Sequence, residues 1–247
     1  MGRIIAIGGG ELRSGDTLGI DKVIVEAANL DKPKLLFIPT ASDDAQAYID
    51  GVEAAFGQRL GCEVKALRLI ESPPPKDEIR DLIQSADIIY VGGGNTKRMM
   101  QVWRQHLVDV YLKEAYEKGV ILSGLSAGAI CWFDYGHSDS DTLASGDIQP
   151  YSLVEGIGLI PMIHCPHYNE EGRADDFSVK VRASGIIGLA LDNYTAIDIK
   201  KDGFRIIKTD KYAHAYRLVP NKQGVRVEVI DETLDYQHID KLYGSRP

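Results

Sequence analysis

The chain has 247 residues, of which 44% are hydrophobic and 26% charged, the balance of an ordinary folded protein with room for a real core. Its 28 Lys and Arg stand against 36 Asp and Glu, a net charge of −8, and an acidic surface that repels phosphate backbones makes nucleic acid an unexpected partner. No apolar run approaches the roughly 18 residues needed to span a bilayer, so no membrane partner is expected either.

The cysteines and the first strand favour a cytoplasmic location. Cys62, Cys131 and Cys165 are odd in number, far apart and without CxxC spacing, which is typical of free thiols in a reducing compartment. The apolar run Ile4–Ile7 is too short for the core of a signal peptide and is expected to be a buried strand.

Short apolar runs alternate with longer stretches of helical period through the first half of the chain. The expected strands are Ile4–Ile7, Lys34–Ile38, Glu63–Leu67, Asp87–Val91 and Val120–Leu125. The expected helices are Asp21–Asn29, Asp44–Leu60, Lys76–Ser85 and a double stretch from Asn95 to Lys118. Such alternation predicts an α/β fold in which helices flank a parallel sheet.

The pattern changes after about Gly203 to closely spaced strands. These are Phe204–Ile207, Tyr212–Leu218 and Val225–Ile230, which predict an antiparallel extension of the same sheet. Because there is no low-complexity linker and no internal repeat, residues 1–247 are expected to form a single α/β domain.

A Gly-x-Ser-x-Gly turn follows the fifth expected strand and precedes an apolar run. Ser126 lies at its apex, flanked by Gly124 and Gly128. A sharp strand-to-helix turn lifts a serine hydroxyl clear of the sheet, and the helix N-terminus offers the N–H of Ala127 to an oxyanion. The alternative is a glycine-rich turn whose serine only caps the helix. The context favours Ser126 as a nucleophile.

A second glycine-rich turn, Gly92-Gly93-Gly94-Asn95, follows the preceding strand. It fails as a dinucleotide-binding fingerprint because Lys97 stands at the sixth position, and no cofactor is expected. It suits the second wall of an oxyanion hole, since glycine lets the backbone approach a substrate closely; a simple tight turn is the alternative. We expect Asn95 to contact the substrate.

The expected general base is a histidine beyond a later strand. His167 follows the apolar run Ile157–Ile163, on the same sheet edge as Ser126, whereas His164 falls inside that run and is expected to be a core residue. His-x-x-His alone is poor evidence for a metal, and none is expected. Asp192, at the end of the strand Ile186–Leu191, is the predicted orienter of the imidazole; an ordinary turn aspartate is the alternative.

These residues, in this order, resemble the peptidase E family of serine peptidases. The resemblance rests on Tyr90–Thr96, the Gly124–Ala129 turn, Pro166-His167-Tyr168 and the strand before Asp192, and extends from Ile4 to about Ile199. It implies a flavodoxin-like fold, related to class I glutamine amidotransferases, in which N–H groups of Gly93 or Gly94 and of Ala127 form the oxyanion hole. The family usually carries a glutamate near the third catalytic position, where this chain has Asp192-Asn193 and the cyanophycinase glutamate falls on Asn193.

The resemblance implies hydrolysis of small acidic peptides, with an N-terminal aspartyl residue, through an acyl-enzyme on Ser126. A cyanophycinase-like β-aspartyl peptidase or another amidase is the alternative within the same class, and a non-catalytic ligand-binding relative is the alternative from another. We expect Arg173, six residues after His167, to bind the acidic side chain of the substrate, unless it forms a surface ion pair. The protein is expected to be a monomer or a homodimer.

Overall fold

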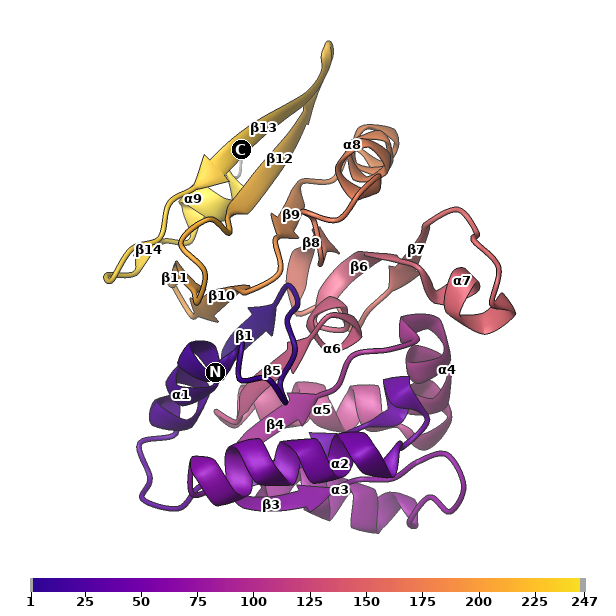
Figure 1. The fold of residues 1–247 in the computed structure, drawn as a ribbon, viewed down its shortest axis with the longest axis vertical. Helices are drawn as coiled ribbons and strands as arrows, with labels where there is room; N and C mark the ends of the chain where they lie inside the picture. The colour runs from indigo at the N-terminus through magenta and orange to yellow at the C-terminus, as the bar shows by residue number, and fades with distance from the viewer. Residues whose placement is uncertain (1, 245–247) are drawn as a thin grey trace.

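A computed structural model describes residues 2–244, and its centre is a parallel sheet (Figure 1). All five strands expected in the first half are present, as β1 (Arg3–Ile7), β2 (Lys34–Ile38), β3 (Glu63–Ala66), β4 (Ile88–Val91) and β5 (Ile121–Leu125). They pair in parallel in the order β1-β5-β4-β2-β3. Their carboxyl ends therefore share one edge of the sheet, where ligands bind in open α/β folds.

Helices cover both faces of this sheet because successive side chains of a buried strand point to opposite sides. Ile5 and Phe37 pack toward α1 (Leu18–Ala27) and α2 (Gln46–Val52), which continues as a π-helical segment, Glu53–Arg59. The opposite-facing residues, such as Ile4 and Leu36, pack toward three further helices. These are α3 (Lys76–Ser85), α4 (Thr96–His106) and α5 (Val108–Glu117). No helix among residues 2–244 is long and apolar enough to cross a bilayer.

The predicted antiparallel extension is only partly correct. Strands β10 (Thr195–Lys200), β11 (Gly203–Lys208) and β14 (Gln237–His238) do extend the sheet beyond β1. The fully buried Asp198 of β10 secures this edge, since its carboxylate accepts hydrogen bonds from Arg3, Arg205 and Tyr236 at 2.6–2.8 Å. Burial alone would raise the pKa of Asp198, but these donors hold it below its usual value.

The remaining strands form a second sheet that the sequence did not predict. Its order is β13-β12-β9-β8-β6-β7. The members are β6 (Phe133–Ser138), β7 (Ser152–Glu155), β8 (Ile160–Cys165), β9 (Gly188–Leu191), β12 (Ala215–Asn221) and β13 (Gly224–Ile230). The helices of this part are α6 (Ala127–Ile130), α7 (Ser140–Ser145), α8 (Arg173–Ser184) and α9 (Asp240–Tyr243). The expected strands at Ile157–Ile163 and Ile186–Leu191 exist, as β8 and β9, but they belong to this second sheet.

The loops after three strands meet at the carboxyl end of β1. The N–H of Ser126, after β5, donates to the Ile7 carbonyl at 3.0 Å. After β8, the N–H of His167 donates to the Gly8 carbonyl at 3.0 Å, and after β9 the N–H of Tyr194 donates to the Gly9 carbonyl at 2.8 Å. Strand ends from both sheets are therefore fixed to one point of the backbone, and this point carries the candidate site.

Candidate active site

Ser126 occupies a strained turn between β5 and α6. Its φ of 57° and ψ of −111° are rarely adopted by a residue with a side chain, and such strain is characteristic of a nucleophile turn. A Cβ added at Gly124 would lie 2.3 Å from the Gly128 carbonyl oxygen, and one at Gly128 would lie 2.1 Å from that of Val91. The two glycines of the motif are therefore required for the turn to pack against β4.

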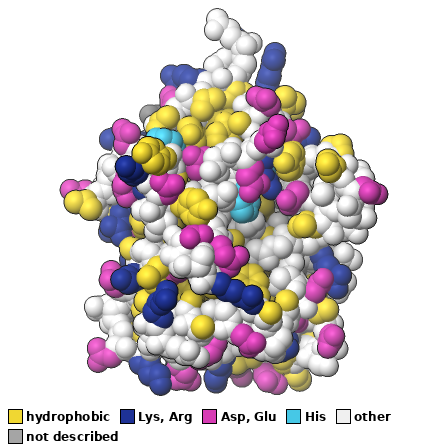
Figure 2. Space-filling view, viewed as in Figure 1, with side chains coloured by type: hydrophobic (Ala, Val, Ile, Leu, Met, Phe, Trp, Pro, Cys, Tyr) yellow, Lys and Arg dark blue, Asp and Glu magenta, His cyan; other side chains and the backbone are white. Residues whose placement is uncertain are grey.

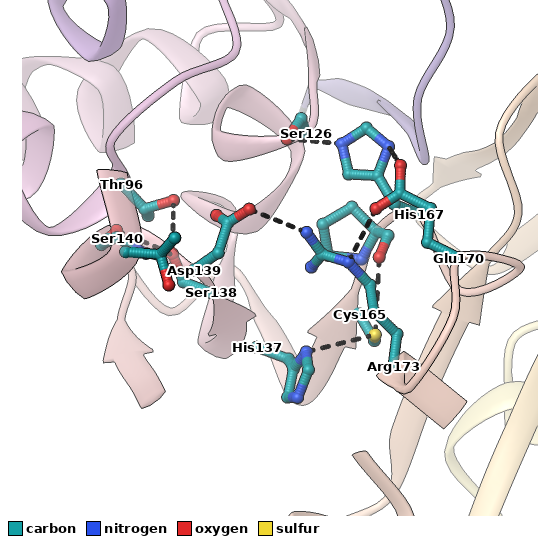
Figure 3. A network of polar contacts seen from close by, with 12 residues as sticks. Thr96, Ser126, His137, Ser138, Asp139, Ser140, Cys165, His167, Glu170 and Arg173 are labelled. Carbon is teal, nitrogen blue, oxygen red and sulfur yellow. Dashed lines mark hydrogen bonds and ion pairs between the residues drawn. The ribbon is translucent and has the colours of Figure 1, made fainter. Parts of the chain in front are cut away.

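His167 lies beside this serine. Its Nε2 is 2.9 Å from the Ser126 Oγ, a hydrogen-bond distance, although the two residues are 41 positions apart (Figure 3). His167 follows the end of β8 with a φ of 52°, and its imidazole is about four-fifths buried. The structure thus brings together the predicted nucleophile and the predicted base.

The third position is taken by Asn193, not by Asp192. The Asn193 Oδ1 lies 2.6 Å from His167 Nδ1, whereas the Asp192 carboxylate is buried and accepts the N–H of His214 at 2.9 Å. β9 ends at Leu191 and the chain turns at Asn193, so the two adjacent side chains leave the backbone toward different partners. The prediction that Asp192 orients His167 is therefore wrong in this structure.

Glu170 adds a negative charge to the same ring nitrogen. Its Oε1 is 3.4 Å from His167 Nδ1, and its Oε2 accepts from Arg173 Nε at 3.2 Å. Arg173 also donates to Asp139 at 2.9 Å, so that a chain of contacts runs from Ser126 through His167, Glu170 and Arg173 to Asp139 (Figure 3).

Arg173 does not stand free in the site as the sequence suggested. Its side chain is only 4% exposed, its guanidinium lies 4.9 Å from the centre of the Tyr151 ring, and its donors are directed to Glu170 and Asp139. Its guanidinium is thus held between two carboxylates, and Arg173 does not line the pocket that opens onto Ser126 and His167. The alternative reading, an ion pair with Glu170, describes the contact, although the pair is part-buried.

Gly9 explains how His167 and Asn193 come so close to β1. A Cβ at Gly9 would lie 1.9 Å from the Asn193 Oδ1 and 2.4 Å from His167 Nδ1. Any side chain there would push the two polar groups apart. A glycine just after the first strand therefore makes room for the imidazole and its partner.

The environment of His167 keeps the imidazole neutral and sets its tautomer. Burial lowers the pKa of His167, while the hydrogen bond to Asn193 and the charge of Glu170 act in the opposite direction. Because the amide and carboxylate oxygens can only accept, Nδ1 must carry the proton. Nε2 is then the acceptor of the Ser126 hydroxyl proton, as a general base requires.

The predicted oxyanion donors differ in availability. No described residue accepts the Ala127 N–H, which begins α6 next to Ser126. The Gly93 N–H is already donated to the Tyr48 hydroxyl at 3.2 Å. Gly94 has a φ of 134°, and its backbone N–H has no acceptor among residues 2–244. Among the described residues, Ala127 and Gly94 therefore each keep an unused N–H, whereas Gly93 does not.

Asn95 caps a helix instead of facing the candidate pocket. Its Oδ1 accepts the N–H of Arg98 at 3.0 Å at the start of α4, and its Nδ2 donates to the Ser140 carbonyl at 3.0 Å. Both ends of the amide are used in holding α4 against α7. The prediction that Asn95 contacts the substrate finds no support in this geometry.

Two other histidines are buried and structural. His164 is fully buried, stacks on Phe133 with ring centres 4.6 Å apart, and has its Nδ1 3.1 Å from the Leu189 carbonyl oxygen, as expected of a core residue. His137 lies 2.8 Å from Asp176 and 3.5 Å from the Cys165 sulfur. Burial raises the pKa of the Cys165 thiol far above its usual range, so this trio holds no reactive thiolate.

A pocket of about 350 Å³ opens onto Ser126 and His167. Its wall includes Gly94 and Tyr48 and the loop after β1, which contributes Glu11 and Arg13. Larger hollows lie elsewhere, including one of about 870 Å³ at the opposite, amino-terminal edge of the sheet. The smaller pocket is the one that contains a hydrogen-bonded serine and histidine, and its size suits a short peptide.

A strained serine on a strand-to-helix turn, a neutral histidine at 2.9 Å and a free N–H beside the serine form the arrangement that serine hydrolases use. The sequence profile of Peptidase family S51 matches residues 4–207. The chain therefore belongs to peptidase family S51, the family of peptidase E, and is a peptidase by membership.

Individual relatives agree with this assignment. The chain is 34% identical over 223 residues to the "Uncharacterized peptidase YgaJ" of Bacillus subtilis (strain 168), covering 89% of this chain and 93% of the relative. It is 29% identical over 217 residues to "Peptidase E" of Shewanella denitrificans, covering 86% of each chain. The crystal structure of a peptidase from an acI-B1 Actinobacterium superposes with a TM-score of 0.67 at 20% identity, covering 94% of this chain and 97% of that one. The predicted fold class and family are confirmed.

The contact between Glu170 and His167 predicts a change in pH dependence. Peptidase activity should fall at low pH as His167 becomes protonated, with a midpoint below the ordinary histidine value of about 6.5, because the pKa of His167 is lowered. A carboxylate near the ring stabilises the imidazolium, so Glu170→Gln lowers the pKa further and moves this midpoint to lower pH. The measurement is kcat/KM against pH, with Glu171→Gln as the matched control. An unchanged profile for Glu170→Gln would leave Glu170 as a purely structural partner of Arg173.

Proposed function

We propose that this chain is a serine peptidase that hydrolyses short acidic peptides, in particular those with an N-terminal aspartyl residue, through an acyl-enzyme on Ser126. The observation that carries the proposal is the 2.9 Å contact between Ser126 Oγ and the Nε2 of a buried, neutral His167. A protein that only binds a ligand needs no base beside a strained serine hydroxyl, which argues against a non-catalytic relative.

The proposed reaction has two halves. The Ser126 Oγ attacks the scissile carbonyl carbon while its proton moves to His167 Nε2, and the N–H groups of Ala127 and Gly94 stabilise the oxyanion. His167 then gives that proton to the leaving amine as the C–N bond breaks, which leaves an ester on Ser126. Water attacks the ester, again losing a proton to His167, and the acid product leaves as Ser126 recovers its proton.

Asn193 supports both halves by holding the imidazole through Nδ1, and Glu170 supplies the negative charge that stabilises the imidazolium formed in each transfer. An amide that orients a catalytic histidine is an established alternative to a carboxylate. The neutral Asn193 amide at 2.6 Å orients the imidazole, and the Glu170 carboxylate at 3.4 Å adds negative charge. Both roles suit a site where burial already lowers the pKa of His167.

Arg13 is the residue we propose to recognise an acidic substrate. It lines the pocket together with Ser126 and His167, its side chain is exposed, and one of its donors reaches the Ala47 carbonyl, which fixes it at the rim of the pocket. Its remaining N–H groups can donate two parallel hydrogen bonds to a substrate carboxylate. In this proposal Arg13 has the role that the sequence predicted for Arg173. Glu11, in the same loop, provides a negative charge for the amino group of the substrate.

A cytoplasmic location fits this proposal. All three cysteines are unpaired and buried, as in a reducing compartment. Short peptides in the cytoplasm would also be the expected source of the substrate.

The proposal is tested with aspartyl and asparaginyl versions of one chromogenic amide, and with β-aspartyl-arginine. We expect the aspartyl amide to be preferred and Arg13→Met to lower its kcat/KM by about 10- to 100-fold, since a hydrogen bond to a charged group contributes about 1.5–3 kcal/mol. The asparaginyl amide should be little affected, and Arg80→Met, an exposed arginine paired with Glu114 outside the pocket, is the matched control. Preferred cleavage of β-aspartyl-arginine would instead favour the cyanophycinase-like activity, and equal losses on both amides would exclude Arg13 from carboxylate recognition.

A further inference from the structure

The hairpin formed by β12 and β13 presents an open sheet edge. β13 is the last strand of the second sheet among the described residues and pairs only with β12. β12 in turn pairs with β9 only over Ala215–Leu218, so the rest of the hairpin, to the turn before Gly224, extends past the sheet and stands out from the body of the molecule (Figure 1). An open edge of seven residues is long enough to accept another strand.

The backbone register shows which groups face outward along this edge. Pro220 has no N–H, and it pairs with Val225, so these two residues form a non-hydrogen-bonded pair of the antiparallel ladder. Pairs alternate along the ladder, and therefore Val227 and Val229 are also in non-hydrogen-bonded pairs. The N–H and C=O groups of Val225, Val227 and Val229 point away from β12, toward the open edge.

Valines alternate with charged residues along this edge, so one face of β13 is apolar. Val227 is 48% and Val229 is 55% exposed, and both lie on the sheet face that carries Leu218 and α8. Hydrophobic side chains gather in this region of the surface, just below the tip of the hairpin (Figure 2). Edge strands of monomers are normally protected by inward charges, prolines or bulges, and β13 itself contains no proline or bulge.

The sequence of β13 is complementary to itself when two copies run antiparallel. A two-fold axis through Val227 places Arg226 opposite Glu228 of the second copy, and Val225 opposite Val229 of the second copy. The three outward-facing valines of each copy then exchange all their N–H and C=O groups. The two charged pairs fall on one face, and the valines form a continuous apolar row on the other, between the α8 helices of the two copies.

We propose that the protein is a homodimer in which the β13 strands of two copies pair antiparallel about a two-fold axis at Val227, joining the two six-stranded sheets. The occupant of the edge is a second copy of this chain because one register aligns the outward-facing backbone groups of both copies and also matches their charges. In that register Arg226, which lies 2.8 Å from Glu228 of its own strand, also stands opposite Glu228 of the second copy. The candidate active site is not part of this interface, since none of the residues lining its pocket lies in β12 or β13. This inference is independent of the proposed peptidase activity.

The test uses a charge pair at the axis itself. At the two-fold axis, Val227 of one copy faces Val227 of the second copy. Val227→Lys therefore brings two ammonium groups together, and Val227→Glu brings two carboxylates together. Each variant alone should be monomeric. An equimolar mixture places Lys opposite Glu and should restore the dimer. The mass of each sample is measured by light scattering over a concentration series, against twice the 27.2 kDa of one chain.

Matched controls separate this interface from a general effect of charge. Val179, on α8 and 63% exposed, is replaced by Lys and by Glu, and both variants should remain dimeric. Because Val227 is already half exposed, the variants should remain folded and retain hydrolysis, and their thermal midpoint should fall only by the stability that dimerisation adds to the parent. A parent that is monomeric throughout the series would overturn the proposal. So would a dimer that survives both single Val227 variants, or a mixture of the two that stays monomeric.

Discussion

Ser126→Ala should abolish peptide hydrolysis while the fold remains intact. The hydroxyl is the only atom removed, and its one contact among the described residues is with His167 Nε2. Loss of a nucleophile that acts as a unit with its base lowers kcat by about 10⁶-fold in serine peptidases. Because removing this hydroxyl leaves no cavity, we expect the thermal midpoint to change little.

The same variant tests the mechanism without a known substrate. A fluorophosphonate probe forms a covalent bond only with an activated serine, so it should label the parent protein and not Ser126→Ala. Ser123→Ala provides the matched control, because Ser123 is buried in β5 with its hydroxyl donated to the Ile89 carbonyl at 2.9 Å. Labelling that persists in Ser126→Ala, or hydrolysis above about a tenth of the parent rate, would remove Ser126 as the nucleophile.

The first half of the fold could be predicted because its signals are local. The five parallel strands are short apolar runs between helical stretches, and the Ser126 turn is defined by small residues within a pentapeptide. The run Pro73-Pro74-Pro75 precedes α3, which begins at Lys76, since proline can come before a helix but not continue one. Here local preference and tertiary structure agree.

The second sheet could not be predicted because it depends on where the chain leaves the Ser126 turn. The apolar run after the turn, Ile130–Phe133, gives no sign of a break, but α6 ends at Ile130 and Phe133 begins β6. Trp132 and Phe133 are both fully buried. A continuous apolar run that is buried on all sides has no periodicity by which a helix could be distinguished from a strand. β8 pairs in parallel with β6, and β9 pairs in parallel with β8, so neither strand joins the sheet that contains β1.

The errors in the site share a physical origin. Asp192 and Asn193 are adjacent in sequence, and only the direction of each side chain decides which one meets His167. Arg173 and Asn95 were chosen for nearness in sequence to the site, yet their side chains are occupied by Glu170 and by the start of α4. Gly9 and Arg13 are more than 150 positions from His167, and no local pattern reveals that the loop after β1 closes over the imidazole.

His167→Gln should be nearly as inactive as the serine variant. Glutamine can keep a hydrogen bond to Ser126 Oγ, but it cannot take up the proton, so the loss should reach about 10⁴- to 10⁶-fold in kcat. His164→Gln is the matched control, three residues away in the same strand region. His164 is fully buried, and burial lowers its pKa to about 3, so it stays uncharged throughout the working range and makes no contact with Ser126.

The comparison is made by kcat/KM, by the rate of fluorophosphonate labelling and by thermal unfolding. His167→Gln should unfold like the parent protein and lose the acid limb of its pH profile, because the residual reaction no longer depends on a neutral imidazole. His164→Gln should keep its catalytic constants even if the replacement of a packed ring, stacked at 4.6 Å on Phe133, lowers the thermal midpoint. If a folded His164→Gln is inactive while His167→Gln still turns over, the base has been assigned to the wrong histidine, and the 2.9 Å contact with Ser126 has no catalytic meaning.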